Sequence, residues 1–112
     1  MEGFIHWLED RAREAKDDIA WLKAQGRADD AAFQSVRANI YDACGAVSRT
    51  LMSRPGAGFP AVRKQFENFR ALWGAALEKA KQHGDIKGIA VEETKLAALE
   101  DIMARLGDEE GK

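Results

Sequence analysis

FPAVRKQFENFRALWGAALEKAKQH, residues 59–83, decides the fold, because it repeats large apolar side chains at helical spacing. Intervals of three and four residues separate the members of this stripe, which are Phe59, Val62, Phe66, Phe69, Trp73, Ala76 and Ala80. Such a pattern, sustained over roughly three heptads, predicts a helix with one apolar face. A face this rich in aromatic rings is costly to leave in water, so we expect the helix to be the centre of a bundle.

The segment before this stretch repeats the same pattern twice. Residues 2–25 predict a first helix, which Gly26 ends. Its stripe consists of Ile5, Leu8, Ala12, Ala15, Ile19 and Leu22. Residues 30–53 predict a second helix, with Asp29 or Asp30 as its N-cap. Its stripe consists of Phe33, Val36, Ile40, Ala43, Val47 and Leu51. Gly45 falls in the middle of this helix, and we interpret it as a point of close helix packing.

The second and third helices are separated by residues 54–58, RPGAG, where Pro55 removes a backbone donor. A fourth helix is expected to start between Ile86 and Val91, with Asp85 as a possible cap, and to end at Gly107. Its stripe consists of Ile89, Leu96, Leu99, Met103 and Leu106. Short connections make sequential helices antiparallel neighbours, so the sequence predicts an all-α, up-down-up-down four-helix bundle. We expect a single domain over residues 1–107 and a frayed polar tail over residues 108–112.

Composition excludes several classes of function. The 17 basic and 19 acidic residues give a net charge of -2, whereas a nucleic-acid-binding domain would show a basic excess. No apolar run reaches the roughly 20 residues that a membrane span needs. The first residues lack the basic segment of a signal peptide, and Cys44 is the single cysteine. We therefore expect a reduced, cytoplasmic protein that binds neither nucleic acid nor membrane.

The sequence offers no evident catalytic or metal site. A metal site in a bundle needs inward-facing carboxylates and histidines, but only His83 and Glu92 fall on the stripes, at helix ends. Lys87 and Gly88 each lie one residue too far from His83 to match a histidine phosphotransfer domain. Cys44 lies beside the second stripe, and burial there would raise its pKa and make it inert. We expect no metal, no cofactor and no enzymatic activity.

The turn between the second and third helices is a candidate anion site. Flexible backbone, the start of a helix and basic side chains come together there, in Arg54, Gly56, Gly58, Arg63 and Lys64. The free N–H groups of a helix N-terminus and nearby cations can together hold an anion. An ordinary solvated turn would have the same sequence features.

The first helix suggests an interface. Trp7 and Trp21 fall outside its stripe, on nearly one face and about 21 Å apart. Large aromatic side chains outside the core are typical of a protein contact. Alternatively, the first helix is buried over a wide arc, or the indoles lie flat on neighbouring helices. The leading functional hypothesis is an interaction or scaffold module that forms a homodimer. The alternative is a small-ligand or anion-binding protein that uses the basic turn.

Overall fold

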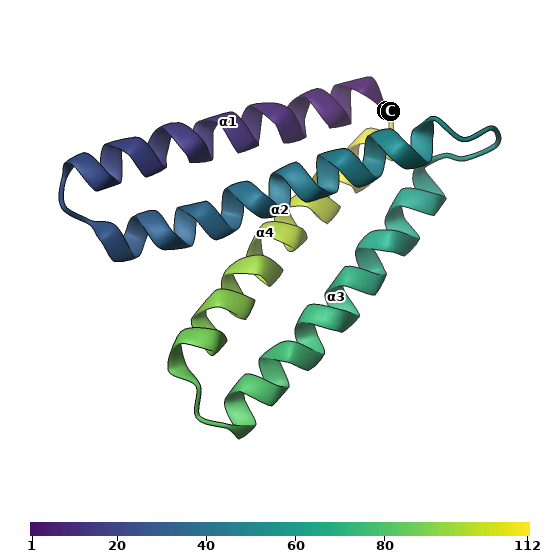
Figure 1. Ribbon diagram of the computed structural model, residues 1–112. Coiled ribbons are helices and arrows are strands. Elements are labelled where there is room, and N and C mark those ends of the chain that lie inside the picture. Colours follow the sequence, from purple (N-terminus) through teal and green to yellow (C-terminus); the bar gives the residue numbers. More distant parts are fainter.

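The computed structural model describes residues 1–112, and it confirms the predicted all-α, up-down-up-down four-helix bundle. Figure 1 shows the helices in chain order. They are α1 (Glu2–Ala24), α2 (Ala28–Met52), α3 (Phe59–Gln82) and α4 (Ile86–Glu110). None of the four combines the length and the low charge that crossing a bilayer requires.

The bundle is built from two antiparallel hairpins that cross and then diverge. The α1–α2 hairpin lies over the α3–α4 hairpin at one end, and the two separate toward their other ends (Figure 1). The radius of gyration is 15.1 Å, whereas a compact chain of this length would have about 13 Å. The four helices therefore share a core at one end of the molecule only.

That shared core, the junction core, draws on all four helices. It takes the N-terminal halves of α1 and α3 and the C-terminal halves of α2 and α4, which the alternating topology places together. Its members are Phe4, Leu8, Ala12, Ile40, Tyr41, Cys44, Val62, Phe66, Ala98, Leu99, Ile102 and Leu106. Phe4 meets Phe66 with ring centroids 6.3 Å apart, so the core joins the two hairpins directly.

The buried faces differ in part from the predicted stripes. Phe4 is fully buried in α1, whereas Ile5 is half-buried. In α2, Tyr41 and Cys44 are buried, whereas Ala43 is exposed. The reason is that α2 packs against α1 on one side and against α4 and α3 on another. Its buried arc is therefore wider than one stripe, and a single series at three- and four-residue spacing cannot describe it.

The helix ends confirm some predictions and correct others. Gly26 follows α1 with φ 72°, as expected of a residue that ends a helix. The Asp85 side chain caps α4 by accepting a hydrogen bond of 3.0 Å from the Gly88 N–H. The prediction that Asp29 or Asp30 caps α2 is wrong, because both lie inside its first turn.

The predicted end of the fourth helix at Gly107 is also wrong. The helix continues to Glu110, because its last turn is held by ion pairs on both sides. Glu109 accepts from Arg105 at 3.0 Å and from Lys112 at 3.2 Å. Glu110 pairs with Arg63 of α3, which fastens this turn to the other helix of the hairpin.

Candidate interaction surface

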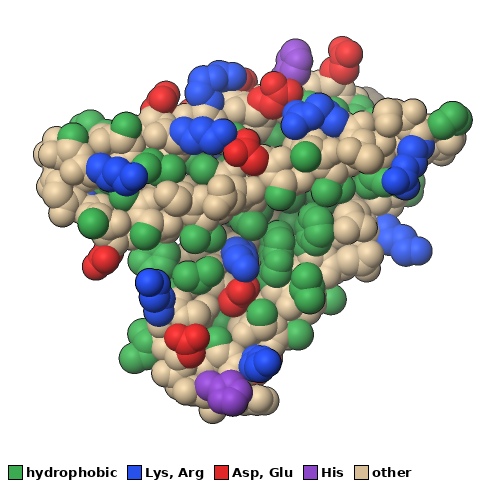
Figure 2. Space-filling model, in the orientation of Figure 1, with side chains coloured by type: hydrophobic (Ala, Val, Ile, Leu, Met, Phe, Trp, Pro, Cys, Tyr) green, Lys and Arg blue, Asp and Glu red, His purple; other side chains and the backbone are tan.

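A groove lies between the two hairpins where they diverge. It has a volume of about 600 Å³, and its walls come from the N-terminal halves of α2 and α4. It is lined by Asp29, Ala32, Phe33, Val36, Ile86, Lys87, Ala90 and Val91. We call this set the hairpin groove. Figure 2 shows the hydrophobic side chains gathered along the region where the hairpins meet.

The rim of the groove carries a large side chain that nothing in the chain covers. Ile86 is 82% exposed, more than any other large apolar residue that faces water in this protein. It is the first residue of α4, and the Asp85 cap fixes the start of that helix. An apolar side chain next to an apolar groove marks a surface on which water is easily displaced.

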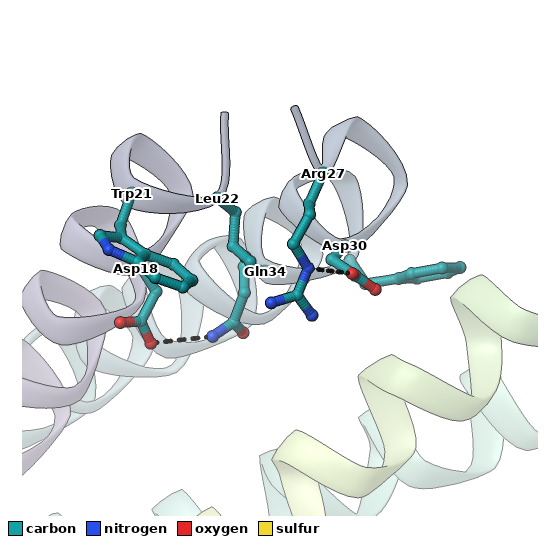
Figure 3. Close-up of a pocket in the computed structure, with 7 residues that line it drawn as sticks. Asp18, Trp21, Leu22, Arg27, Asp30 and Gln34 are labelled. Atoms are coloured by element: carbon teal, nitrogen blue, oxygen red, sulfur yellow. Dashed lines mark hydrogen bonds and ion pairs between the residues drawn. The ribbon is translucent and has the colours of Figure 1, made fainter. Parts of the chain in front are cut away.

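A second hollow extends this surface onto the α1–α2 hairpin. It has a volume of about 370 Å³ and contains Trp21, which is 58% exposed, together with Phe33 from the groove. In Figure 3, Trp21 and Leu22 project from α1 toward Gln34 and Arg27 of the next helix and loop. Because Phe33 lines both hollows, Trp21 and the hairpin groove belong to one surface.

Two charged residues stand on opposite walls of the groove. Asp29 lies on the α2 wall and Lys87 on the α4 wall. Neither forms an ion pair within the chain, whereas the neighbouring Asp30 is held by Arg27 at 2.9 Å. The groove therefore presents one free negative and one free positive charge, on walls contributed by different hairpins.

Trp7 does not lie on an outer face, contrary to the prediction. Its ring stacks on Phe4 at 6.3 Å and meets Tyr41 edge-on at 6.2 Å, so it packs against the junction core. The guanidinium of Arg105, from α4, lies 5.6 Å from its centroid. The alternative interpretation, in which the indole lies against neighbouring helices, is correct for this residue. Of the two tryptophans predicted to form the interface, only Trp21 is exposed.

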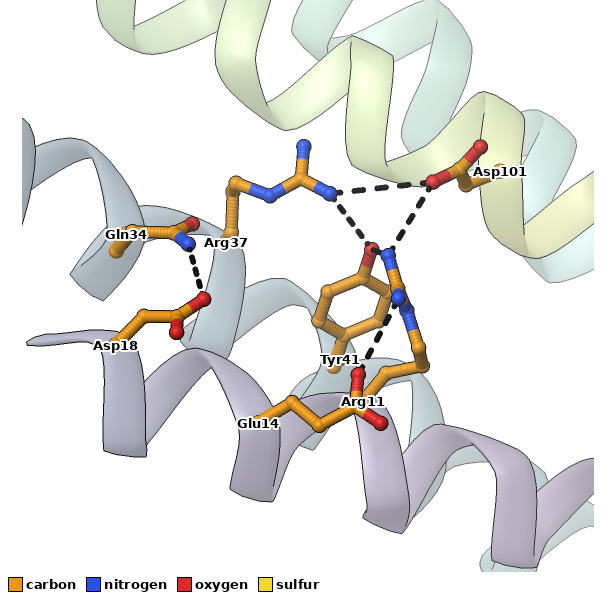
Figure 4. A network of polar contacts seen from close by, with 7 residues as sticks. All are labelled: Arg11, Glu14, Asp18, Gln34, Arg37, Tyr41 and Asp101. Carbon is orange, nitrogen blue, oxygen red and sulfur yellow. Dashed lines mark hydrogen bonds and ion pairs between the residues drawn. The ribbon is translucent and has the colours of Figure 1, made fainter.

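A network of polar side chains lies at the junction beside Trp7 and links α1, α2 and α4 (Figure 4). The buried Tyr41 hydroxyl accepts hydrogen bonds from Arg11 at 3.4 Å and Arg37 at 3.0 Å. The hydrogen bond from Arg11 raises the pKa of its guanidinium above the ordinary value. Asp101 of α4 lies 3.8 Å and 3.9 Å from the same two guanidinium groups and offsets their repulsion. The network links the hairpins, and every cation in it has a partner.

The structure does not bring all the predicted anion-site residues together. Arg63 turns away to pair with Glu110. Arg54 and Lys64 are exposed and form no ion pair. Gly58 is the N-cap of α3 and offers no side chain to its first turn, while Gly56 takes a positive φ of 78° in the loop. Two cations and an uncapped helix start therefore remain at this turn.

The remaining reactive side chains stand alone. Burial raises the pKa of the Cys44 thiol to about 12, which fits its predicted place in the core. His83 is exposed at the end of α3. No group of three His, Cys, Asp or Glu side chains is close enough to hold a metal ion.

Comparison of this chain with protein-family models, with curated proteins and with solved structures finds no match.

Sequence reasoning missed the hairpin groove. The apolar pattern assigns Phe33 and Val36 to an interior stripe, and it places Ile86 only at the uncertain start of the fourth helix. Residues 86–91 carry two Ile and one Val, although the sequence assigns this turn no partner helix. These apolar residues without an assigned partner were the available signal. The hairpins diverge here (Figure 1), and in this region Ile86 is exposed while Phe33 and Val36 are half-buried.

Proposed function

We propose that the protein is a non-enzymatic interaction module that self-associates through the hairpin groove and the adjoining Trp21. The observation that carries this proposal is the exposure of Ile86, 82%, beside an apolar groove of about 600 Å³. Burying one such side chain contributes about 1.5–3 kcal/mol, so the rim alone provides a substantial driving force for association. Trp21 adds an aromatic ring of the kind enriched in protein interfaces.

The proposal changes the predicted interface in one respect. Trp21 stays within it, but Trp7 leaves it, because its ring contacts Tyr41 and Arg105. The interface moves accordingly from the outer face of α1 to the space between the hairpins. The lone, buried Cys44 supports our further proposal of a reduced, cytoplasmic location.

Sedimentation velocity over a range of protein concentrations tests the proposal. We expect the sedimentation coefficient of the wild type to rise with concentration. Ile86→Asp should hold the protein as a monomer at all of them. Because Ile86 is exposed, this change should leave the fold intact, which circular dichroism checks. Leu72→Asp is the matched control, since Leu72 is 64% exposed on α3 and lies outside the groove. A wild type that remains monomeric throughout would overturn the proposal.

A second candidate function is anion binding at the α2–α3 turn. It is supported by Arg54 and Lys64, which have no ion-pair partner, and by the uncapped start of α3. Thermal shifts with inorganic phosphate test it. We expect phosphate to raise the unfolding temperature of the wild type and to have no effect on an Arg54→Ala, Lys64→Ala double variant. Equal shifts in both proteins would remove this candidate.

A further inference from the structure

The surface around the hairpin groove combines an exposed apolar side chain with an apolar recess. The rim projects Ile86, and the groove behind it is an apolar hollow walled by Phe33 and Val36. The chain thus carries on one surface both a projecting residue and a recess that can receive such a residue. Within one chain Ile86 cannot fill this recess, because it forms part of the recess wall and is 82% exposed.

We infer that the partner is a second copy of this chain, related by a two-fold axis, with Ile86 of each copy seated in the hairpin groove of the other. This inference rests on the proposed self-association and adds its arrangement. In a two-fold pair the same surface is used twice, so both projecting residues and both recesses are filled. A head-to-tail pair would leave one recess and one Ile86 open at its ends, and it would continue into a filament.

The charges of the groove support the same arrangement. Lys87 follows Ile86 in the chain, so it enters the partner's groove beside it. The opposite wall of that groove carries Asp29, which has no partner within its own chain. Its neighbours Asp30 and Asp85 are already engaged, the first by Arg27 and the second by the Gly88 N–H. The two-fold pair therefore forms the Asp29–Lys87 contact twice and opposes like charges at neither position.

Charge reversal and mixing test whether Asp29 of one copy meets Lys87 of the other, and a dimer that does not grow into larger oligomers distinguishes the two-fold pair from a head-to-tail one. Asp29→Lys places two lysines against each other at both contacts, and Lys87→Asp places two aspartates there. Each variant alone should dimerise about tenfold more weakly than the wild type at low salt. An equimolar mixture of the two should recover affinity, because both contacts of the mixed pair then join opposite charges: one is the native Asp29–Lys87 contact, and the other is the same contact with its charges reversed. High salt should reduce all these differences.

Sedimentation equilibrium of each variant and of the mixture measures these affinities, with Glu67→Lys, an exposed acid on α3, as the charge control. A wild-type dimer whose affinity neither variant changes would overturn the inferred arrangement and leave the proposed self-association standing. So would recovery by the Asp29→Lys, Lys87→Asp double variant without recovery in the mixture, because that result places the pair within one chain. A wild type that does not dimerise overturns both.

Discussion

The two hairpins bury their apolar residues differently once they leave the junction core. Beyond it, α1 and α2 still bury Ala15, Leu22, Ala31 and Ala38 against each other. In the corresponding part of the α3–α4 hairpin, no residue between positions 67 and 97 is buried. The side chains on its inner faces, Trp73 among them, are only half-buried.

Side-chain size explains the contrast at the positions next to the junction core. Alanines let two helix backbones approach closely, so a two-helix layer can exclude water unaided. The α3 stripe instead carries Phe69 and Trp73, which stack along their own helix with centroids 5.2 Å apart. Lys95 of α4 covers one Trp73 face at 5.9 Å. Rings of this size are buried fully only when a second layer of helices packs on them. Because the hairpins diverge, no such layer covers this part of α3. This loosely packed part of the molecule also supplies Ile86 to the groove.

The largest expected effects come from truncating one aromatic ring in the junction core and one in the outer part of the α3–α4 hairpin. Phe66→Ala should lower the free energy of unfolding by about 3–5 kcal/mol, because Phe66 is fully buried in the junction core. Trp73→Ala should lower it by about 2 kcal/mol, because its half-buried ring loses less buried area. Urea unfolding monitored by circular dichroism measures both. Equal losses would show that the outer part of the α3–α4 hairpin is packed as firmly as the junction.

The sequence predicted the number and order of the helices well, because each has a local apolar period. Phe66 is buried, as its place in the apolar stripe of residues 59–83 predicts. Which face of a helix is buried depends on how many neighbours it has. Periodicity alone therefore placed Ala43 in the core, whereas the contacts of α2 with three other helices bury Tyr41 and Cys44.

The candidate site could be predicted far less well than the fold. Trp7 is covered by Arg105, which lies at the opposite end of the sequence, and no local pattern reports such a contact. Arg63 is withdrawn from the basic turn by Glu110, which lies beyond the predicted helix end. The groove exists because the two hairpins diverge beyond the junction where Phe4 meets Phe66, and no local pattern in the sequence reports such a contact between distant segments.

A smaller effect should appear at Cys44, within the junction core, at alkaline pH. Unfolding exposes a thiol with an ordinary pKa of 9.0, whereas burial in the fold raises the pKa to about 12. The unfolded chain therefore binds fewer protons above pH 9, and stability falls as pH rises. Between pH 9 and 10 the thiol should cost about 1 kcal/mol. Well below pH 9 its contribution is constant.

Cys44→Ala isolates this contribution from the titration of lysines and tyrosine. The free-energy difference between wild type and variant, from urea unfolding at each pH, should shift by that amount between pH 9 and 10. A difference independent of pH would mean that the thiol is solvated in the folded protein, and hence that the junction is open around it.

A loss of about 1 kcal/mol is expected from Asp85→Ala, at the loose end of the α3–α4 hairpin. The carboxylate caps α4 through the Gly88 N–H at 3.0 Å, and no other helix of the bundle has a side-chain cap. Asp85→Asn keeps an acceptor and should lose much less. In the α1–α2 hairpin, Asp30→Ala removes only an exposed ion pair with Arg27 and should change stability by less than about 0.5 kcal/mol. Thermal unfolding compares the three variants.

The smallest effects, and the only gains among these variants, are expected from replacing one helical glycine in each hairpin by alanine. Gly74→Ala in α3 places a methyl group in open space and should stabilise the protein by about 0.5–1 kcal/mol. Gly45→Ala in α2 should give a similar gain. Its new Cβ would lie 3.9 Å from the Leu8 Cβ and 3.6 Å from Arg49 Nη1, which are ordinary contact distances.

Urea unfolding of these two variants decides whether Gly45 is needed for close packing, as its place in the middle of α2 suggests. The distances around Gly45 leave room for a methyl group even where α1 and α2 lie side by side. If Gly45→Ala destabilises the protein while Gly74→Ala stabilises it, the α1–α2 hairpin is packed more closely than these distances imply. The contrast between the hairpins would then be larger, because one would tolerate no added atom at a site where the other gains from it.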